Sequence, residues 1–381
     1  MSEIKVAIAG VGNCTNSLVQ GRFYYEDKEQ TLKNKTTFPP SLDGRGRGEG
    51  EREIIPGLMH PVLGGYKVTD IVPVVAFDVD KRKVGKDLSE AIWASPNCTK
   101  KFSEVPHLGV KVLMGPVLDG VTEHLKRYVE VSSEKEIDNV DKVAQILKDN
   151  RADALVINLP TASEKAAWFY AEAAFKAKAG IVNGIPVLIA NDKVFAKKAE
   201  KNKVPIVGDD YKSQLGGTIL DRDLLNLCIQ RGIKITKSYQ LNYGGNTDFW
   251  NLTDYSRGKT KHASKKRGVD SVMTYPAPFS VNVSHLEVLN DDKICRIEIW
   301  GENFGGTPIK LEAKLHVVDS PNSAGVMVDA IRCCKLALDR GIGGVLESAS
   351  SYLMKSTPKQ YSSEERARKA MDEWIKGKRG E

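Results

Sequence analysis

Several features that would place the chain in a membrane or outside the cell are missing from the sequence. No uncharged apolar run approaches the length that spans a bilayer. The chain enters an apolar stretch at Ile4 without the basic region, apolar core and cleavage site of a secretory signal. Its 6 cysteines are scattered and form no Cys-x-x-Cys pair, which argues against a disulfide framework and a zinc knuckle. We therefore expect a cytoplasmic protein with reduced thiols and no membrane partner.

Nucleic-acid binding and a strong metal site are also poorly supported. Acidic and basic residues are interspersed despite a formal net charge of +7, and aromatic residues make up only 7% of the chain. A nucleic-acid protein more often carries a continuous basic stripe with aromatic residues between the charges. The histidines are isolated, so no His, Cys and carboxylate group has the spacing of metal ligands. We expect no nucleic-acid partner and no certain metal site; any divalent cation would be held weakly, by a bound phosphate, Asp319 and water.

The chain has enough length and apolar residues for two domains. Its 381 residues, 41% of them hydrophobic, exceed the size at which a single core usually keeps growing. We predict an α/β fold in which residues 1–233 form a Rossmann-type doubly wound parallel sheet. Residues 234–321 then form a second, α+β domain, and helices within residues 322–381 return to the first.

The chain opens with the strand, glycine turn and helix of a dinucleotide-binding unit. The apolar run 5–9 is followed by Gly10 and Gly12, which permit a tight turn and the close approach of a pyrophosphate to the following helix. Thr15 stands where the third glycine of the fingerprint would fall, so the strict pattern fails; the two glycines alone are a weak signal, and the alternative is an ordinary strand-to-helix turn. A second apolar run ends in Asp78, whose carboxylate would accept the ribose hydroxyls and repel the extra phosphate of NADP. This pattern favours NAD.

The segment between these two strands has a different composition. Residues 24–68 are rich in glycine, proline and charge, and such a composition buries little apolar surface. We predict a mobile insertion, which could serve as a lid or be an inert loop.

Apolar strands and helices alternate up to residue 233. Runs at 154–160, 181–184 and 204–208 each precede a polar residue or turn, and their alternation with helices implies a parallel sheet covered on both faces. Ligands bind beyond the carboxyl ends of such strands. Asn158 and Asp210 therefore fall at the expected binding edge.

From residue 234 the apolar pattern has a period of two. Alternation of this kind is typical of half-buried antiparallel strands. The predicted strands are 234–243, 284–289, 294–300 and 309–318. A helical period follows from 322 to 339, and a charged helix is expected from 363 to 376.

The stretch 208–266 contains more carboxylates, amides and lysines than folding alone requires. Ammonium and amide groups neutralise and hydrogen-bond phosphate oxygens, whereas their burial in a core would cost free energy. We therefore predict a phosphorylated ligand.

Several motifs, in one order along almost the whole chain, resemble the myo-inositol-1-phosphate synthase (inositol-3-phosphate synthase) family in its shorter prokaryotic form. Spaced motifs in a fixed order are more specific than one glycine turn. They are Gly208-Asp209-Asp210-Tyr211-Lys212-Ser213, residues 242–248 with Asn251-Leu252, Lys261-x-x-x-Lys265, Asp292-Lys293, Asp319-Ser320 and Ser351-Tyr352-Leu353-Met354-Lys355.

The resemblance implies an isomerase that converts D-glucose 6-phosphate to inositol 1-phosphate with bound NAD and no net redox change. The implied steps are hydride removal at C5, enolisation at C6, ring closure onto the C1 aldehyde and hydride return. Proton abstraction and aldol closure both develop negative charge on oxygen, which preorganised cations stabilise. The resemblance also implies a homotetramer with the second sheet at its interface.

The resemblance assigns roles to particular residues. Lys261 would handle the C5 hydroxyl proton and Lys265 would hold substrate oxygens. The expected catalytic residues are Lys261, Lys265, Lys293 and Lys355; the substrate-binding residues are Asp210, Ser213, Asn246 and Asp248; and the cofactor-binding residues are Gly10, Gly12, Asn13, Cys14, Asp78, Asn158 and Asp319. The polar residues among them also suit turn caps, since Asn, Asp and Ser often serve there.

The sequence departs from the family pattern at two places and leaves two other functions open. Residues 208–218 are longer than the family's Lys-Ser-Gly-Gln-Thr motif, and Thr247 replaces a second asparagine. A net NAD-dependent dehydrogenase of a phosphorylated sugar, polyol or semialdehyde would share both domains but would accumulate NADH. A non-catalytic NAD-binding protein would not need the lysines.

Overall fold

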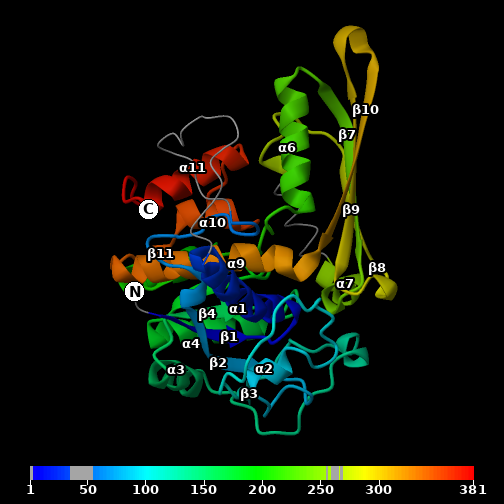
Figure 1. Cartoon of the computed structure of the whole chain (residues 1–381). Coiled ribbons are helices and arrows are strands. Elements are labelled where there is room, and N and C mark those ends of the chain that lie inside the picture. Colours follow the sequence, from blue (N-terminus) through cyan, green and yellow to red (C-terminus); the bar gives the residue numbers. More distant parts are fainter. Residues whose placement is uncertain (1–2, 35–54, 255, 259–265, 267–268) are drawn as a thin grey trace.

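The computed structural model describes residues 3–34, 55–254, 256–258, 266 and 269–381. Its larger sheet is made of β1 (Ile4–Ala9), β2 (Ile71–Asp78), β3 (Val112–Met114), β4 (Ala154–Ile157), β5 (Gly180–Asn183), β6 (Pro205–Val207) and β11 (Gly344–Val345). These 7 strands pair in parallel in the order β11-β6-β5-β4-β1-β2-β3 (Figure 1). The predicted Rossmann-type parallel sheet is confirmed.

Both faces of this sheet are covered by helices, because its strands carry apolar side chains on both sides. Along β1, Ile4, Val6 and Ile8 belong to one core cluster, and Ala7 and Ala9 belong to the other. The first cluster lies under α1 (Asn13–Asn34), α9 (Asp319–Asp339) and α10 (Glu347–Leu353), and the second under α3 (Val140–Asp149), α4 (Glu164–Ala177) and α5 (Lys193–Lys201). The short helix α2 (Leu88–Ala91) follows β2, and α11 (Glu364–Ile375) packs on α10.

The second sheet has 4 strands in the order β10-β9-β7-β8, with bounds β7 (Lys234–Gly244), β8 (Phe279–His285), β9 (Asp292–Glu302) and β10 (Pro308–Val318). Strand β9 pairs antiparallel with β7 and β10, whereas β8 runs parallel to β7. The strand predicted at 284–289 is wrong: β8 ends at His285, and Glu287–Leu289 form a 3-10 turn. Its apolar residues suggested burial, but Leu286 is 45% exposed and Val288 is 85% exposed.

Helix α6 (Gly217–Gln230) packs on one face of the second sheet, where Leu225 and Cys228 contact the core residues of β9. The helix and the hairpin β9–β10 rise together away from the larger sheet (Figure 1). Helix α7 (Thr247–Thr253) follows β7 and packs against β8. The start of α6 and the whole of α7 thus lie where the two sheets meet.

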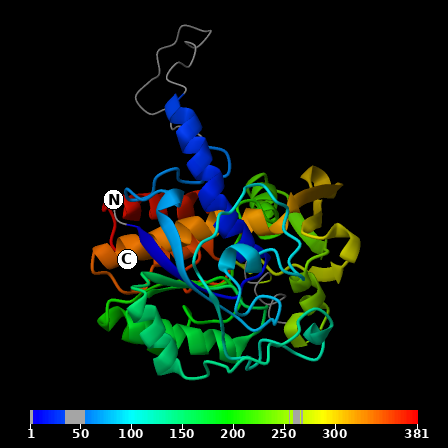
Figure 2. The ribbon, with the colours of Figure 1, turned by 60° about the horizontal axis from the view of Figure 1, so that its bottom comes forward.

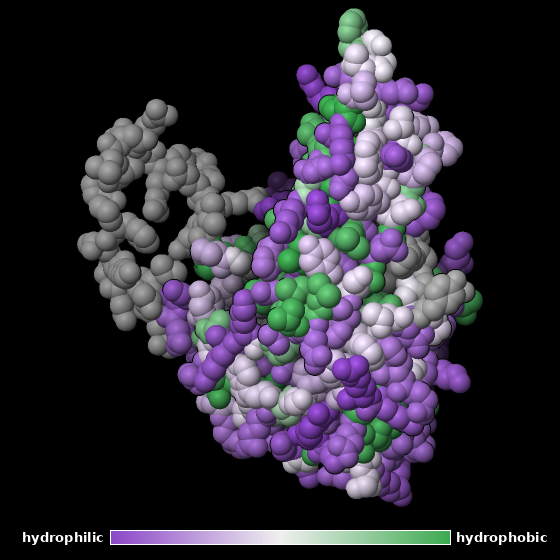
Figure 3. Space-filling view, turned by 90° about the vertical axis from the view of Figure 1, so that its right-hand side faces the viewer, coloured by the Kyte–Doolittle hydropathy of each residue, from purple (hydrophilic) through white to green (hydrophobic). Residues whose placement is uncertain are grey.

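The other face of the second sheet carries mixed side chains. Lys310, Glu312, Lys314 and His316 alternate along β10 and are exposed. Figure 3 shows hydrophilic and apolar side chains interspersed on this side of the molecule. The predicted tetramer interface would use this face, and it stays a prediction.

Helix α9 joins the C-terminal region to the first sheet. It begins at Asp319, earlier than the predicted start at 322, and it packs against α1 and along β4, β5 and β6. Its N-terminus carries the polar residues 319–323, and its later turns are almost entirely buried. One helix therefore reaches from the junction of the sheets into the core. Among the described helices, none combines the length and hydropathy needed to cross a membrane.

The predicted insertion at 24–68 has the wrong boundaries. Helix α1 continues through Asn34 and extends out of the body of the molecule (Figure 2), so residue 24 lies within a helix. On the return, Leu63, Tyr66 and Val68 are buried against α9 and its neighbours. These apolar residues are spaced among glycines and prolines, which hid their role in the core. The remaining part of the insertion, 35–54, lies outside the described residues.

A buried charged cluster holds the return segment in place. His60 Nδ1 lies 2.5 Å from Asp329 Oδ2 on α9, and Nε2 lies 2.9 Å from Asp372 Oδ1 on α11. Arg332 donates to the carboxylate of Asp329 and to the His60 carbonyl oxygen. Burial opposes protonation of His60, but hydrogen bonds and charge from Asp329 and Asp372 outweigh it, so the pKa of His60 is raised.

We expect His60→Gln to lower the free energy of unfolding by roughly 1.5–3 kcal/mol below pH 6, since hydrogen bonds to charged groups are lost. A raised pKa in the folded state gives stability that is fully present below the pKa of the unfolded histidine, about 6.5. That stability is lost as the pH rises through the folded pKa. The difference between wild type and variant, measured by urea unfolding at several pH values, should therefore shrink at alkaline pH. His107→Gln, at a side chain that is 75% exposed, is the control; a pH-independent difference for His60 would contradict the prediction.

Candidate functional site

A cavity lies where the carboxyl ends of the parallel strands meet the second sheet. Gly10, Asp78, Asn158 and Asp210, which follow or end β1, β2, β4 and β6, line one side of it. Lys293 on β9 lines the other side. The cavity therefore occupies the edge at which parallel sheets bind their ligands.

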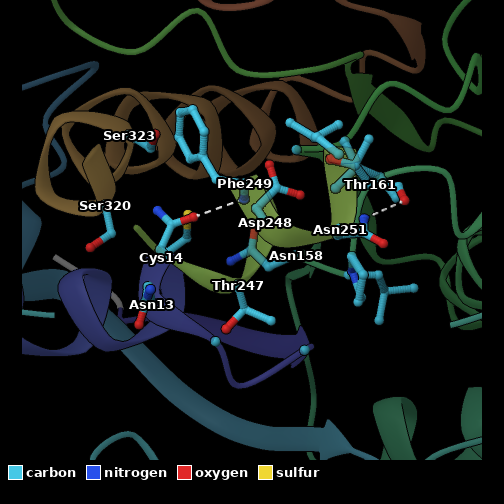
Figure 4. A pocket seen from close by; sticks show the side chains of 18 of the residues that line it. Asn13, Cys14, Asn158, Thr161, Thr247, Asp248, Phe249, Asn251, Ser320 and Ser323 are labelled. Atoms are coloured by element: carbon cyan, nitrogen blue, oxygen red, sulfur yellow. Dashed lines mark hydrogen bonds between the residues drawn. The ribbon is translucent and has the colours of Figure 1, made fainter. Parts of the chain in front are cut away.

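Three helices direct side chains into this cavity. Helix α1 contributes Asn13 and Cys14, α7 contributes residues 247–249, 251 and 252, and α9 contributes Ser320 and Ser323 (Figure 4). Asn251 on α7 donates to the carbonyl oxygen of Thr161, 3.0 Å away, which ties α7 to the loop after β4. The second domain and the nucleotide-binding edge are thus joined around one space.

The glycine turn after β1 has the shape that a bound pyrophosphate requires. Gly10 has φ +95°, and a Cβ there would lie 2.3 Å from the carbonyl oxygen of Asn158. At Gly12, by contrast, a Cβ would meet nothing within 4 Å, so the space over this residue is open. Thr15, which replaces the third glycine, donates to the Gly10 carbonyl oxygen at 2.7 Å and accepts from Asn158 at 3.1 Å. Its hydroxyl stabilises the turn from within the helix.

The carboxylate of Asp78 is fixed by backbone N–H groups. Oδ2 accepts from Val11 at 2.7 Å, and Oδ1 accepts from Val79 at 2.7 Å and from Asp80 at 2.9 Å. Lys83 Nζ lies 3.7 Å from Oδ2. Asp78 is thus held at the end of β2, where a ribose is recognised in dinucleotide-binding sheets.

A lysine–carboxylate pair lies at the start of α9. Lys293 Nζ donates to Asp319 Oδ1 at 2.9 Å, and Asn246 donates to Asp319 Oδ2 at 3.3 Å. Behind them Asp291 accepts from Asn246 at 3.3 Å and from the hydroxyl of Ser320. Burial and the nearby charge of Asp319 raise the pKa of Asp291 to about 6. This group therefore presents one ammonium to the cavity, oriented by carboxylates and an amide.

A second pair lies on the opposite side, between the loop after β6 and the segment after α10. Lys355 Nζ donates to Asp210 Oδ1 at 3.1 Å, and the Lys355 N–H donates to the Asp210 carbonyl oxygen at 2.7 Å. Asp209 is fully buried and accepts from Asn183 at 2.8 Å and from Asn191 at 3.1 Å. Burial raises the pKa of Asp209 to about 7. The buried carboxylate anchors the loop from which Asp210 reaches Lys355.

Next to this pair, α6 begins at the cavity wall. Gly216, Gly217 and Thr218 line the cavity, and the N-cap Gly216 makes no side-chain capping hydrogen bond. The N-terminus of a helix attracts anions through its N–H groups and its dipole. Since Lys355 lines the same cavity, the start of α6 suits a phosphate.

The lengthened loop at 208–218 lines the cavity from residue 210 onward, except near its middle, where Gln214 and Leu215 lie outside it. Ser213 and Gly216 line the cavity, whereas Gln214 donates to the Gly57 carbonyl oxygen at 2.8 Å and Leu215 is 49% exposed. Gln214 therefore contacts the return segment of the insertion, and Leu215 exchanges hydrogen bonds with Asn322 on α9.

Lys212 lines the cavity as well and belongs to a buried network. Its ammonium donates to Glu364 at 3.0 Å and to the carbonyl oxygen of Ser351 at 2.7 Å. Burial, assisted by the positive charge of Arg222, lowers the pKa of Lys212 to about 8, although Glu364 opposes the shift. This lysine ties α11 to the loop that carries Asp210.

Comparison with known proteins identifies the family. Residues 216–320 match the family model of myo-inositol-1-phosphate synthase. An inositol-3-phosphate synthase of Corynebacterium glutamicum is 46% identical over 369 residues, covering 94% of each chain. One of Mycolicibacterium smegmatis is 45% identical over 383 residues, covering 98% of each. The chain belongs to the inositol-3-phosphate synthase family. The resemblance drawn from the motifs is confirmed, and the protein is an enzyme of this family.

The fold agrees with this membership. The crystal structure of a myo-inositol-1-phosphate synthase-related protein from Thermotoga maritima superposes with a TM-score of 0.76 at 25% identity, over 98% of each chain.

The structure brings most of the predicted site residues of this family member together. The cavity is lined by Gly10, Gly12, Asn13, Cys14, Asp78, Asn158, Asp210, Ser213, Asn246, Asp248, Lys293, Asp319 and Lys355. Lys261 and Lys265 lie outside the described residues. The lining also contains Lys83, Asn97 and Gln240, which the sequence did not single out. The sequence pattern could have identified Gln240, because it lies two residues before Asn242 on the same polar face of β7. No sequence pattern marks Lys83 or Asn97 as lining residues.

No metal-binding group emerges from the part of the chain that the structure describes: it contains no cluster of three or more His, Cys, Asp and Glu side chains able to hold an ion.

Proposed function

We propose that the protein converts D-glucose 6-phosphate to 1D-myo-inositol 3-phosphate, also called myo-inositol 1-phosphate, by internal oxidation, enolisation, aldol cyclisation and reduction. The observation that carries the proposal is the convergence of two lysine–carboxylate pairs on a cavity that also contains the glycine turn of a dinucleotide site. A net dehydrogenase needs the dinucleotide site but has less use for two oriented ammonium groups.

The dinucleotide end of the cavity fits NAD, the cofactor of the family. The open space over Gly12 and the start of α1 suit a pyrophosphate, and Asp78 suits the ribose hydroxyls. Asn13, Cys14 and Asn158 line the wall beside them. When bound there, NAD supplies a hydride acceptor that later returns the hydride.

The two lysines stabilise negative charge that develops on substrate oxygens. Lys293 is 22% exposed in its side chain and Lys355 is 10% exposed, so water screens them little. Asp319 and Asp210 orient the ammonium groups before substrate arrives, which avoids reorganisation during the reaction. From the family resemblance we assign the C5 hydroxyl proton to Lys261 and substrate oxygens to Lys265.

The phosphate of the substrate would lie at the start of α6. Backbone N–H groups of the first turn and the Lys355 ammonium can share its charge. Ser213, Asn246 and Asp248 then offer hydrogen bonds along the sugar. Anchoring the phosphate would hold the reacting carbons near the Lys293 pair.

The test is to incubate the purified protein with glucose 6-phosphate and NAD and to follow the product by phosphorus NMR. We expect inositol phosphate with no lasting rise in NADH absorbance. Accumulation of NADH in proportion to product would instead establish a net dehydrogenase, and the absence of any turnover would favour a non-catalytic role.

Three further parts complete the proposal. The family resemblance implies a homotetramer whose second sheet forms the interface, and the scattered cysteines favour the cytoplasm. Any divalent cation would be held weakly, by substrate phosphate, Asp319 and water. Light scattering after size-exclusion chromatography measures the assembly, and assays with and without a chelator test the cation.

A further inference from the structure

The turn after β2 places a lysine against the carboxylate that is expected to recognise ribose. Lys83 Nζ lies 3.7 Å from Asp78 Oδ2 and 3.2 Å from Asn97 Oδ1. The side chain of Lys83 is 6% exposed and that of Asp78 is 11% exposed. All three residues line the cavity. The ammonium is therefore held in a fixed position at the edge of the ribose site.

The basic residues next to it in the sequence point elsewhere. Lys81 pairs with Glu130 on the surface. Arg82 is occupied by the carboxylate of Asp80 and by the Tyr128 carbonyl oxygen. Neither Lys81 nor Arg82 lines the cavity, so of these three consecutive basic residues Lys83 alone reaches it.

Asn97 fixes the ammonium from the other side. Its amide nitrogen donates to the carbonyl oxygens of Val11 and Ile92, 2.9 Å from each. These two bonds orient the amide oxygen of Asn97 toward Lys83. Val11 belongs to the glycine turn, so Asn97 also connects Lys83 to that turn. Lys83 is thus held by two side chains, the negatively charged Asp78 and the neutral Asn97.

We propose that Lys83 is a latent 2′-phosphate receptor and that Asp78 suppresses it. The inference rests on the proposed function, because it assumes that this end of the cavity binds the adenosine part of NAD. With Asp78 present, the pair is neutral and accepts ribose hydroxyls, while a 2′-phosphate would face the carboxylate. Without the Asp78 carboxylate, the buried ammonium of Lys83 would lack a negative partner. A bound 2′-phosphate would then supply the negative charge that pairs with this ammonium.

The experiment compares NAD⁺ and NADP⁺ by titration calorimetry on protein freed of bound nucleotide. Asp78→Asn keeps an oxygen that can accept from Val11 but removes the charge. We expect it to shift the ratio of NADP⁺ to NAD⁺ affinity by about tenfold or more toward NADP⁺, since a hydrogen bond to a charged group contributes that much. Adding Lys83→Met to Asp78→Asn should abolish the gain, whereas adding Lys81→Met, with the same change in net charge, should preserve it. Thermal unfolding checks each fold, and Asp78→Ser replaces Asp78→Asn if the latter unfolds.

Two results would overturn the inference: an unchanged affinity ratio in the Asp78 variant, or a gain that survives loss of Lys83. In either case wild-type protein that binds NAD⁺ would leave the proposed cofactor intact. Wild-type protein that binds neither nucleotide would contradict both the inference and the proposed cofactor.

Discussion

Replacing Lys293 with alanine should lower the rate of inositol phosphate formation by roughly 10²–10³-fold, the usual effect of removing one preorganised group that stabilises an oxyanion. The ammonium lies at the cavity wall and donates to Asp319 over 2.9 Å, so its position is fixed before substrate binds. Its loss also leaves the carboxylate of Asp319 facing the space in which negative charge develops. The measurement is product formation by phosphorus NMR, with NAD⁺ affinity by titration.

The control for this variant is Lys266→Ala. Lys266 is 62% exposed in its side chain and pairs with Asp270, so its removal makes the same change of charge away from the wall. NAD⁺ affinity should change little in either variant, because the glycine turn and Asp78 are untouched. Full activity in the Lys293 variant would remove this lysine from the proposed chemistry.

Gly12→Ala should weaken NAD⁺ binding by at least about tenfold while leaving the unfolding free energy of the nucleotide-free protein nearly unchanged. A Cβ at Gly12 meets nothing within 4 Å in the protein and would project into the space proposed for the pyrophosphate. Titration calorimetry and urea unfolding measure the two quantities separately.

Gly10→Ala is the matched contrast, two positions earlier in the same turn. Its Cβ would lie 2.3 Å from the Asn158 carbonyl oxygen, and φ is +95°. We expect a loss of at least about 2 kcal/mol in the nucleotide-free protein from strain in the backbone. Equal NAD⁺ affinity in wild type and the Gly12 variant would refute the position assigned to the pyrophosphate.

The parallel sheet and most of its binding edge were predictable because they depend on local patterns. Strands β4 and β6 lie within the predicted runs 154–160 and 204–208 and end at Ile157 and Val207, and Asn158 and Asp210 beyond these ends line the cavity. The return segment was not predictable in this way. Leu63 and Tyr66 become buried only because α9, far along the chain, covers them. The composition of a segment does not show which distant helix will cover it.

The site residues also differ in how far local sequence patterns could predict them. Asp78 was found from its place after an apolar strand, but Lys83 was not, because its role depends on Asn97 and on a turn that no periodicity marks. The lengthened loop was noted as a departure at the substrate pocket. The path of this loop could not be predicted, because Gln214 is held by the carbonyl oxygen of Gly57. Gly57 lies in the segment 24–68, which its composition predicts to be a mobile insertion.

Helix α9 supplies Asp319 and Ser320 to the cavity and, farther along, Asp329 and Arg332 to the cluster around His60. Attempts to alter substrate choice by redesigning this helix would therefore change folding yield at the same time. In the loop after β3, Pro116, Val117, Gly120 and Val121 border the same space without being part of the core helices. For directed evolution, these four positions are the safer place to introduce diversity, whereas Asp119 accepts from the first N–H groups of α4 and should be kept.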